Sequence, residues 1–370
     1  MNAALALMAA LAATPTSDPH IELVTMGPSP LLFHRYGHAA LCVVHERRPQ
    51  RALCYNYGTT NFESPPQELG WKFLRGTAQF RVSIQPYRQM LWLYRRADRT
   101  IWVQRLPLGP AQVRRMVQLL EHDMLEENRD YTYHHFDDNC STRLRDHIDR
   151  VTGGALRKGS GKTLGVTYRE LGRRGIADQT HLIVASHFLL GRRLDRQVTV
   201  WGSMFHPDSL RQQVHRRLGA EPIRIHQRRG RSLPTDGGYK LAWVFLIAVL
   251  LALPMAVTRL LGRFERVGIG VTSTSLTLLA SAIWFVALVT TVKELRVNEA
   301  LLVFWPSDLL LVILGPRRRQ RYAWVRLGWL LLVALLLLSG VLIQPLWVPL
   351  LIPALPCLLL IWPIKTLKNS

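Results

Sequence analysis

The carboxy-terminal part of the sequence most constrains what this chain can fold into, because from about residue 239 onward it is almost continuously apolar. A helix that crosses the hydrocarbon core of a bilayer needs roughly 17 to 25 predominantly apolar residues. Segments of about this length occupy residues 241–258, 267–292, 300–315, 327–343 and 346–363. We therefore predict an all-α transmembrane domain with five spanning helices over residues 239–370.

The loops between these segments differ in charge, which is a test independent of the apolar count. Two alternate loops are nearly neutral, because Lys293 and Arg296 are offset by Glu294 and Glu299 and the turn at Gln344 has no charge. Because basic loops face the cytoplasm, we predict a cytoplasmic carboxy terminus and an external location for the residues before 239. The basic residues that follow the first, third and fifth segments are Arg259, Arg263 and Arg266; Arg317, Arg318, Arg319, Arg321 and Arg326; and Lys365 and Lys368.

The amino terminus agrees with export. Residues 1–20 begin MNAALALMAALAATPTS, with an apolar core of about signal-peptide length and small residues at Ala10 and Ala12. The stretch lacks the basic residues that usually open a signal peptide. We predict a signal peptide or retained apolar leader, followed by an exported domain.

The chain is strongly basic, with 47 Lys and Arg against 25 Asp and Glu. Nucleic acid is the usual partner of such a surface, but an exported domain tethered to a bilayer does not meet it. Anionic lipid headgroups are the nearer partner. Residues 225–238 form a linker rich in Arg, Gly and Pro, whose Arg228, Arg229 and Arg231 either attract headgroups or simply flank the first span.

Residues 38–57, HAALCVVHERRPQRALCYNY, indicate two strands joined by a polar turn. A turn symmetric about residue 48 places Cys42 opposite Cys54, Ala40 opposite Asn56 and His38 opposite Gly58. Side-chain alternation then puts His38, Cys42, Cys54 and Asn56 on one face. In an oxidising compartment Cys42 and Cys54 form a disulfide or remain two buried thiols, and the pattern fits both.

Further strands are predicted over 79–84 and 100–106 and a helix over 109–125. After Cys140, apolar residues at helical spacing and a pair of glycines at 153 and 154 predict another helix. Asp138 or Asn139 is a good amino-terminal cap for it. Cys140 is therefore expected in the first turn, where free N–H groups favour the thiolate.

A cysteine at a helix start, a histidine on a neighbouring strand and an amide that orients the histidine are the components of a thiol acyl-transfer enzyme. Cys140 is the candidate nucleophile, His38 the candidate base, and Asn56 or His34 the residue that orients it. Two alternatives stay open: Cys140 is a small buried apolar residue, or it binds a metal together with residues from elsewhere in the chain. The local ligand types for such a site are His134, His135, Asp137, Asp138 and Cys140.

Three stretches of the chain resemble one known family. They are GHAAL at 37–41, YNYGTTNF at 55–62 and YHHFDDNCSTRLRD at 133–146. Their order and spacing are similar to those of the amino-terminal periplasmic domain of the Lnb family of bacterial lipoprotein N-acyltransferases. The resemblance continues more weakly through 189–196 and 205–210 and covers most of residues 22–216. It implies a multi-pass protein of the bacterial inner membrane whose catalytic domain, residues 21–224, faces the periplasm.

The order of histidine before cysteine, with NC opening a helix, also resembles the circularly permuted branch of the NlpC/P60 papain-like superfamily. That resemblance implies a permuted papain-like α+β fold and an acyl-enzyme route, with the nucleophile at Cys140 and the base at His38. Permuted members often have histidine where this chain has Asn56, which leaves the third residue open. The matched motifs also contain Tyr57, Asp138 and Asn139 as supporting residues.

The resemblance implies a transfer of an acyl chain from a phospholipid, through a Cys140 thioester, to the amino group of a diacylglyceryl-cysteine lipoprotein. No cofactor or metal ion is expected for this chemistry. Asp308, inside WPSDLLL of the third apolar segment, is costly at membrane depth. It either lines a path for the acceptor amine, or the segment is broken at Pro306 and Asp308 lies near the interface.

Three rival functions remain at this stage. A phospholipase of the same fold shares the first half-reaction with a transferase. A cysteine amidase or peptidase acting on cell-wall peptide is known in the wider superfamily, although five spans are more than a wall substrate requires. A scaffold or sensor protein with an inert, buried Cys140 is the third.

Overall fold

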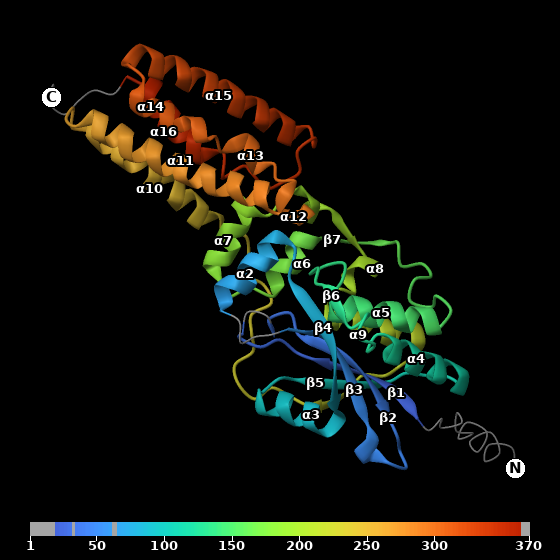
Figure 1. Cartoon of the computed structure of the whole chain (residues 1–370). Coiled ribbons are helices and arrows are strands. Elements are labelled where there is room, and N and C mark those ends of the chain that lie inside the picture. Colours follow the sequence, from blue (N-terminus) through green and yellow to red (C-terminus); the bar gives the residue numbers. More distant parts are fainter. Residues whose placement is uncertain (1–18, 32–33, 61–64, 364–370) are drawn as a thin grey trace, which may run out of the picture. The chain divides into compact units, whose positions relative to one another are not determined.

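The computed structural model describes residues 19–31, 34–60 and 65–363 (Figure 1). Most of the predicted leader and the basic tail residues Lys365 and Lys368 fall outside these ranges. The chain divides by packing into two compact units. The sheet unit comprises the described residues up to Leu69, then Thr77–Gly165 and Val198–Leu233, and the helical unit comprises Gly70–Gly76, Val166–Gln197 and the residues from Pro234 onward.

A seven-stranded sheet in the order β6-β4-β3-β2-β1-β5-β9 organises the sheet unit. Each paired neighbour is antiparallel, so short turns connect the successive strands β2 and β3. A separate two-stranded sheet joins β7 to β8. The strands are β1 (His20–Met26), β2 (His38–Val44), β3 (Leu53–Thr59), β4 (Gln79–Pro86), β5 (Ile101–Arg105), β6 (Asp130–Thr132), β7 (Thr163–Thr167), β8 (Gln197–Thr199) and β9 (Ile223–His226).

Helices cover both faces of the large sheet. Alternate residues of β1 to β3, such as Val24, Ala40 and Cys42, form one buried cluster with Met90 of α3. The residues between them, such as Leu23 and Leu41, are fully buried on the other face, where α5 and α9 contact the strands. The helices that follow these strands are α2 (Pro66–Arg75), α3 (Tyr87–Arg96), α4 (Pro110–His122), α5 (Cys140–Val151), α8 (Val200–Ser203) and α9 (Pro207–Leu218), with a 3-10 turn η2 (Pro49–Arg51).

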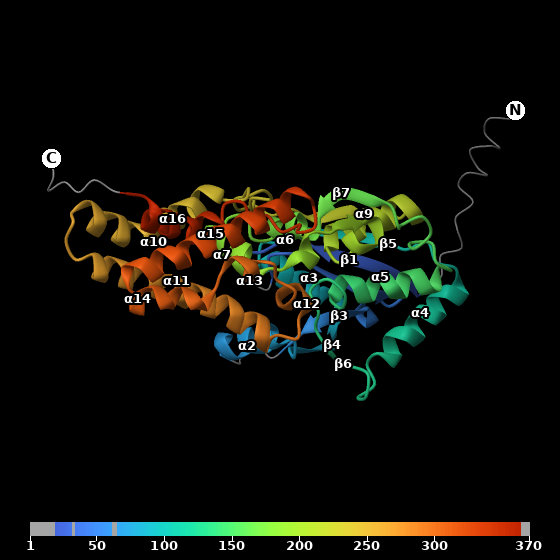
Figure 2. The same ribbon diagram turned by 90° about the horizontal axis from the view of Figure 1, so that it is seen from above.

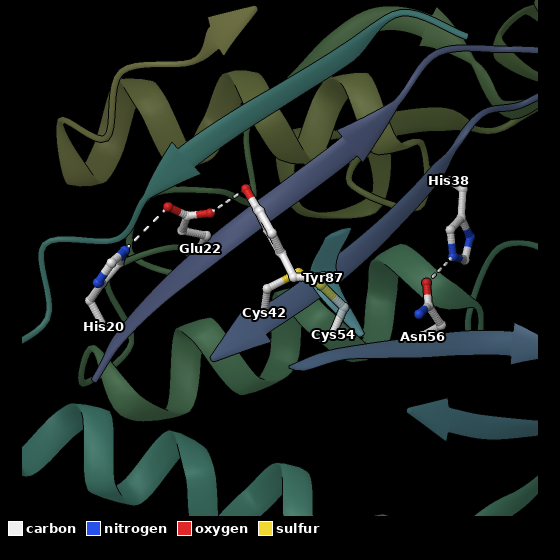
Figure 3. The surroundings of a disulfide bond; sticks show 7 residues. All are labelled: His20, Glu22, His38, Cys42, Cys54, Asn56 and Tyr87. Carbon is white, nitrogen blue, oxygen red and sulfur yellow. Dashed lines mark hydrogen bonds and ion pairs between the residues drawn. A yellow bond between two sulfur atoms is a disulfide. The ribbon is translucent and has the colours of Figure 1, made fainter. Parts of the chain in front are cut away.

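The predicted pairing of β2 with β3 is confirmed. Ala40 pairs with Asn56 and Cys42 with Cys54, in an antiparallel ladder closed by the 45–52 turn. Cys42 and Cys54 form a disulfide, which decides between the two states that the sequence left open. Figure 3 shows the disulfide between the two strands, with His38 and Asn56 beyond it on the same face. This register places His38 of β2 and Asn56 of β3 close to each other on neighbouring strands.

Loss of the Cys42–Cys54 disulfide is expected to lower the free energy of unfolding of the sheet unit by about 3 kcal/mol. The bond closes a loop of sequence separation 12, which restricts the unfolded chain. Thermal unfolding with and without dithiothreitol measures the loss, and a Cys42→Ala/Cys54→Ala variant serves as control because reductant should not change it. An equal midpoint for the oxidised and reduced wild type would contradict the prediction.

The helical unit contains three helices long and apolar enough to cross a membrane: α10 (Leu241–Leu260), α11 (Glu265–Val289) and α15 (Pro316–Leu338). Figures 1 and 2 both show α10 and α11 running side by side. The other elements of this unit are α6 (Tyr168–Arg174), α7 (Thr180–Leu189), η3 (Arg192–Asp195), α12 (Lys293–Arg296), α13 (Ala300–Val303), η4 (Pro306–Leu309), α14 (Leu310–Ile313) and α16 (Leu351–Ile361).

The third predicted span is not a continuous helix, and the prediction of five long spanning helices is corrected here. Residues 300–313 form three short pieces, α13, η4 and α14, with a break at Phe304 and Trp305, just before Pro306. Pro306 lacks the N–H that would continue the helix. The freed carbonyls find side-chain donors, because Trp284 Nε1 donates to the oxygen of Phe304 and Arg326 donates to that of Val303. Broken backbone inside a packed apolar unit requires internal partners of this kind.

The fourth and fifth predicted spans also differ from the structure. The fourth begins at Pro316 rather than 327, because the cluster from Arg317 to Arg326 forms the first turns of α15 and not a loop. Arg319 donates to the carbonyl oxygens of Leu311 and Val312 at the end of α14. The fifth is the short helix α16, which is 11 residues long.

Segment 166–197 packs with the helical unit, although its sequence lies inside the predicted exported domain. Gly191 N–H donates to the oxygen of Glu294, and Gln344 donates to the oxygen of Leu190. The buried Arg169 binds Asp195 with both Nε and Nη2, at 2.6 and 2.8 Å, and thereby holds this segment together. The predicted boundaries at residue 20 and at the 225–238 linker stay predictions.

Candidate active site

His38 and Asn56 meet on neighbouring strands at one end of the large sheet. His38 Nε2 lies 3.1 Å from Asn56 Oδ1 (Figure 3). With the carboxamide oxygen facing the ring, Nε2 carries the proton in the neutral imidazole and Nδ1 keeps its lone pair. This is the tautomer that a general base needs, because Nδ1 is then free to accept a proton. Asn56 is itself buried, and its side-chain amide contacts the His38 ring through this hydrogen bond.

Cys140 is the first residue of α5, as the sequence predicted. Asn139 is the cap: its Oδ1 accepts hydrogen bonds from the N–H groups of Ser141 and Thr142, at 2.8 and 2.9 Å. The Asn139 Nδ2 donates to the carbonyl oxygens of His135 and Phe205, which ties the helix start to two other segments. The Asn139 side chain therefore caps the N–H groups of Ser141 and Thr142, but not the N–H of Cys140.

The sulfur lies where β2 begins and β3 ends. A side chain at Gly58 of β3 would place its Cβ 3.8 Å from the Cβ of Cys140. The register of β3 shifts between Tyr57 and Thr59, and Gly58 has a φ of +93°, a region that favours glycine. On the β2 side, the backbone of Ala39, next to His38, is close enough to the sulfur to lower the pKa of the Cys140 thiol. Cys140 and the His38–Asn56 pair therefore occupy the same end of the sheet.

Burial favours the neutral forms of both the Cys140 thiol and the His38 ring. It raises the pKa of the Cys140 thiol, and it outweighs the opposing effects of hydrogen bonds from Ala39 and Ser141 and of the Arg99 charge. Burial, together with the Arg99 charge, lowers the pKa of His38 to about 3. The sequence-based expectation of a resting thiolate is thus corrected: the helix terminus alone does not offset the loss of water around the sulfur.

Among the described residues no hydrogen bond joins the His38 ring to the Cys140 sulfur, whose side-chain contact is Ser141 Oγ at 3.9 Å. Catalytic hydrogen bonds of this type often tighten only when substrate is bound. The Cys140 side chain is partly exposed, so it is accessible to a substrate. The arrangement supports proton transfer from a neutral thiol to a neutral imidazole during attack on a carbonyl.

The supporting residues have different places in the structure. His34 is close enough to His38 to lower its pKa, but the ring's hydrogen bond goes to Asn56. Asp138 binds Arg143 through both carboxylate oxygens, at 2.6 and 3.0 Å. Asp138 thus fixes the first turns of α5.

Tyr57 anchors the other end of the same helix. Its hydroxyl donates to Asp123 at 2.8 Å and lies 3.0 Å from His147 Nε2, while His147 also contacts Asp123 at 2.8 Å. The three side chains join β3, the residue after α4, and α5. Tyr57 therefore helps to set the position of the helix that carries Cys140.

Asp308 belongs to the helical unit, and its charge is already compensated. Its carboxylate binds the Arg326 guanidinium, with Nε at 3.0 Å, and accepts a hydrogen bond from the Tyr322 hydroxyl at 2.8 Å. Asp308 is 3 % exposed and Arg326 is fully buried. These contacts compensate the charge of Asp308 within the helical unit, and both interpretations of its role stay predictions.

The metal-binding alternative finds no support in residues 19–31, 34–60 and 65–363, where no three His, Cys, Asp or Glu side chains converge as ligands would. His134 contacts Asp137 at 3.4 Å, and Asp138 is bound by Arg143. The clustering of ligand types in the sequence therefore does not become a cluster in space.

Sequence reasoning missed four residues around the sulfur. Tyr94 of α3 stacks on the His38 ring, with ring centroids 6.1 Å apart. Tyr131, Tyr133 and Arg99 each interact electrostatically with Cys140. Only Tyr133 stood inside a motif that the sequence singled out, and nothing in the local pattern distinguishes Arg99 from the many other arginines of this chain.

The sheet unit is thus an α+β domain with an antiparallel sheet, in which a cysteine at a helix start lies beside a histidine–asparagine pair. Residues 9–174 match the family model described as the Lnb N-terminal periplasmic domain. The matched range includes Cys140, His38 and Asn56 and ends before α7. Beyond that range the chain contains the three candidate membrane-spanning helices α10, α11 and α15. No curated protein and no solved structure matches the chain.

Proposed function

We propose that this protein is a membrane-anchored thiol acyltransferase of the bacterial inner membrane, with a permuted papain-like catalytic domain in the periplasm and a cytoplasmic carboxy terminus. It transfers an acyl chain from a phospholipid to the amino group of a diacylglyceryl-cysteine lipoprotein. The observation that carries the proposal is the position of Cys140 at the start of α5, beside the His38–Asn56 pair, within the range that matches the Lnb N-terminal periplasmic domain.

The first half-reaction forms a thioester and releases a lysophospholipid. The Cys140 sulfur attacks the ester carbonyl while His38 takes the thiol proton, and the N–H of Cys140 serves as a donor to the resulting oxyanion. When the tetrahedral intermediate collapses, the ester C–O bond breaks and His38 returns the proton to the leaving lysophospholipid oxygen. Asn56 holds the ring through both proton transfers.

The second half-reaction reverses the roles. The lipoprotein amine attacks the thioester carbonyl, His38 accepts a proton from the amine, and the C–S bond breaks to restore the Cys140 thiol. An apolar helical unit serves this route, because donor and acceptor are both confined to a bilayer. A thioester that is shielded from water favours the amine over hydrolysis.

The direct test uses full-length protein in detergent micelles, phospholipid with an isotopically labelled acyl chain, and a synthetic diacylglyceryl-cysteine lipopeptide. Equimolar lysophospholipid and N-acylated lipopeptide, measured by mass spectrometry, are the expected products. Lysophospholipid and free fatty acid with unchanged lipopeptide would identify a phospholipase instead. Cleavage of a cell-wall muropeptide, without either lipid product, would identify an amidase or peptidase.

The pH dependence of thioester formation follows from the low pKa of His38. Burial and the Arg99 charge lower this pKa to about 3, so the ring is neutral and able to accept a proton at pH 5. The single-turnover rate of lysophospholipid release should therefore stay within about twofold between pH 7 and pH 5. An unperturbed histidine of pKa about 6.5 would leave about 3 % of the base at pH 5.

This assay omits the acceptor, because an α-amino group of pKa about 8 would itself be protonated in the acid range. A thirtyfold fall in rate at pH 5, with unchanged circular dichroism, would contradict the assignment of a buried neutral His38.

A further inference from the structure

Arg99 is a buried cation that has no carboxylate partner among the described residues. It lies just before β5, and its side chain is 1 % exposed. Buried guanidinium groups are normally paired, as Arg169 is with Asp195 and Arg326 with Asp308. In the part of the chain that the structure describes, no ion pair and no side-chain hydrogen bond connects Arg99 to an acid. An uncompensated buried charge is costly, so its retention at this position calls for a compensating anion.

Backbone groups at the end of β1 hold the guanidinium in place. Arg99 Nε donates to the carbonyl oxygen of Gly27 at 2.7 Å, and Nη2 lies 3.5 Å from that of Met26. The face of the guanidinium rests on the Tyr94 ring, with Cζ 4.8 Å from the centroid. These contacts use some of the five N–H donors of the guanidinium, but none of the partners carries a negative charge that would neutralise it.

The same contacts place the charge beside the candidate nucleophile and base. Met26, whose oxygen faces Arg99, pairs with His38 across the β1–β2 ladder. The Tyr94 ring contacts both Arg99 and His38, and it stacks on His38 with an interplanar angle of 24°. The charge of Arg99 acts on both members of the site, since it lowers the pKa of His38 and opposes the rise in the pKa of Cys140.

The other titratable groups near the sulfur do not supply a free positive charge that could stabilise a Cys140 thiolate. Tyr94, Tyr131 and Tyr133 are neutral phenols whose pKa burial raises. Asp138 is neutralised by Arg143, and burial and Arg99 lower the pKa of His34. Arg99 is therefore the positive charge that acts on the sulfur.

We propose that Arg99 is the counter-charge of the Cys140 thiolate, held beside the site by the end of β1 and by Tyr94 so that the sulfur becomes negative there at low energetic cost. The proposal rests on Cys140 being the nucleophile of the proposed function. In this role Arg99 is a positioning residue, which acts through the sulfur and does not contact the substrate. It stabilises the sulfur anion in both half-reactions, when the thiol is deprotonated and when the thioester C–S bond breaks.

The test is the pH profile of alkylation of Cys140 by iodoacetamide, in which the thiolate displaces iodide. Full-length protein in micelles is alkylated for short times between pH 7 and pH 11.5, because the midpoint is expected in the alkaline range, and mass spectrometry of the Cys140 peptide gives the rate. Arg99→Gln should move the midpoint of the profile upward by about one pH unit or more, because a nearby opposite charge lowers a pKa by 1 to 3 units. Arg99→Lys keeps the charge and should stay closer to the wild type than to Arg99→Gln.

Arg96→Gln is the matched control. Arg96 also lies over an aromatic ring, that of Trp92 at 5.3 Å, but it is exposed on α3 and its charge is screened by water. Its profile should coincide with that of the wild type. If Arg99→Gln does not give the wild-type circular dichroism spectrum, Arg99→Met replaces it as the neutral variant.

Two results would overturn the proposal. One is a midpoint in the neutral Arg99 variant that equals the wild-type value, and the other is an equal shift in Arg99→Gln and Arg99→Lys, which would indicate geometry rather than charge. Because alkylation needs no lipid, this outcome is separate from that of the acyl-transfer assay. A shifted midpoint without any lipid product would leave the electrostatic role standing and reject the proposed function.

Discussion

Replacing Cys140 with alanine is expected to reduce acyl transfer to a diacylglyceryl lipopeptide by at least about a thousandfold, because covalent catalysis is lost with the sulfur. His38→Ala should cause a loss of similar size, since the resting thiol is neutral and depends on the imidazole to remove its proton. Residues that act as one unit are not additive. The Cys140→Ala/His38→Ala double variant should therefore be no slower than the slower single variant.

Cys357→Ala is the matched control for this prediction. Cys357 is the other free cysteine among the described residues, and it is buried in α16 of the helical unit. The same chemical change there should leave the transfer rate within about twofold. Initial rates of N-acyl lipopeptide formation by mass spectrometry decide the matter. If folded Cys140→Ala protein kept more than a few per cent of the wild-type activity, Cys140 would be excluded as the nucleophile.

Replacing Arg326 with glutamine is expected to lower the stability of the helical unit by about 3 to 5 kcal/mol. The substitution leaves the Asp308 carboxylate buried with only the Tyr322 hydroxyl as partner. It also removes the donor to the Val303 carbonyl at the break between α13 and η4. Denaturant-induced unfolding in detergent micelles, followed by tryptophan fluorescence, measures the loss.

Arg321→Gln provides the comparison, because Arg321 is exposed on the same helix and its loss should cost less than about 0.5 kcal/mol. Replacing both charges, as in Asp308→Leu/Arg326→Met, should recover most of the stability, since an apolar pair does not carry the desolvation cost of two ions. If Arg326→Gln is no less stable than Arg321→Gln, the ion pair does not hold the broken segment in place.

Local patterns were sufficient to predict the centre of the sheet unit. The turn between β2 and β3 is short, and strict alternation on both strands leaves one register, which places His38 and Asn56 on one face. Asn139 followed by residues at helical spacing determines the start of α5, and with it the position of Cys140. These features depend on sequence neighbours, so the sequence alone determines them.

The features that were missed depend on contacts distant in the sequence. Arg99 has its role through Met26, Tyr94 and Cys140, and its own neighbourhood carries no signal of that role. The basic start of α15 looked like a loop because Arg residues near a span are usually outside it, whereas Arg326 is neutralised by Asp308 within the helical unit. Burial of the thiol, which raises the pKa of Cys140, is likewise a property of the packed site.

The most direct test of the central claim is mass spectrometry of the Cys140 peptide after full-length protein has been incubated with phospholipid and no acceptor. The account predicts a fatty acyl group on Cys140 that hydroxylamine removes and that disappears, with formation of N-acyl lipopeptide, when the lipopeptide is added. Unmodified Cys140 throughout a reaction that nevertheless yields N-acyl lipopeptide would contradict it, since transfer would then proceed without the thioester.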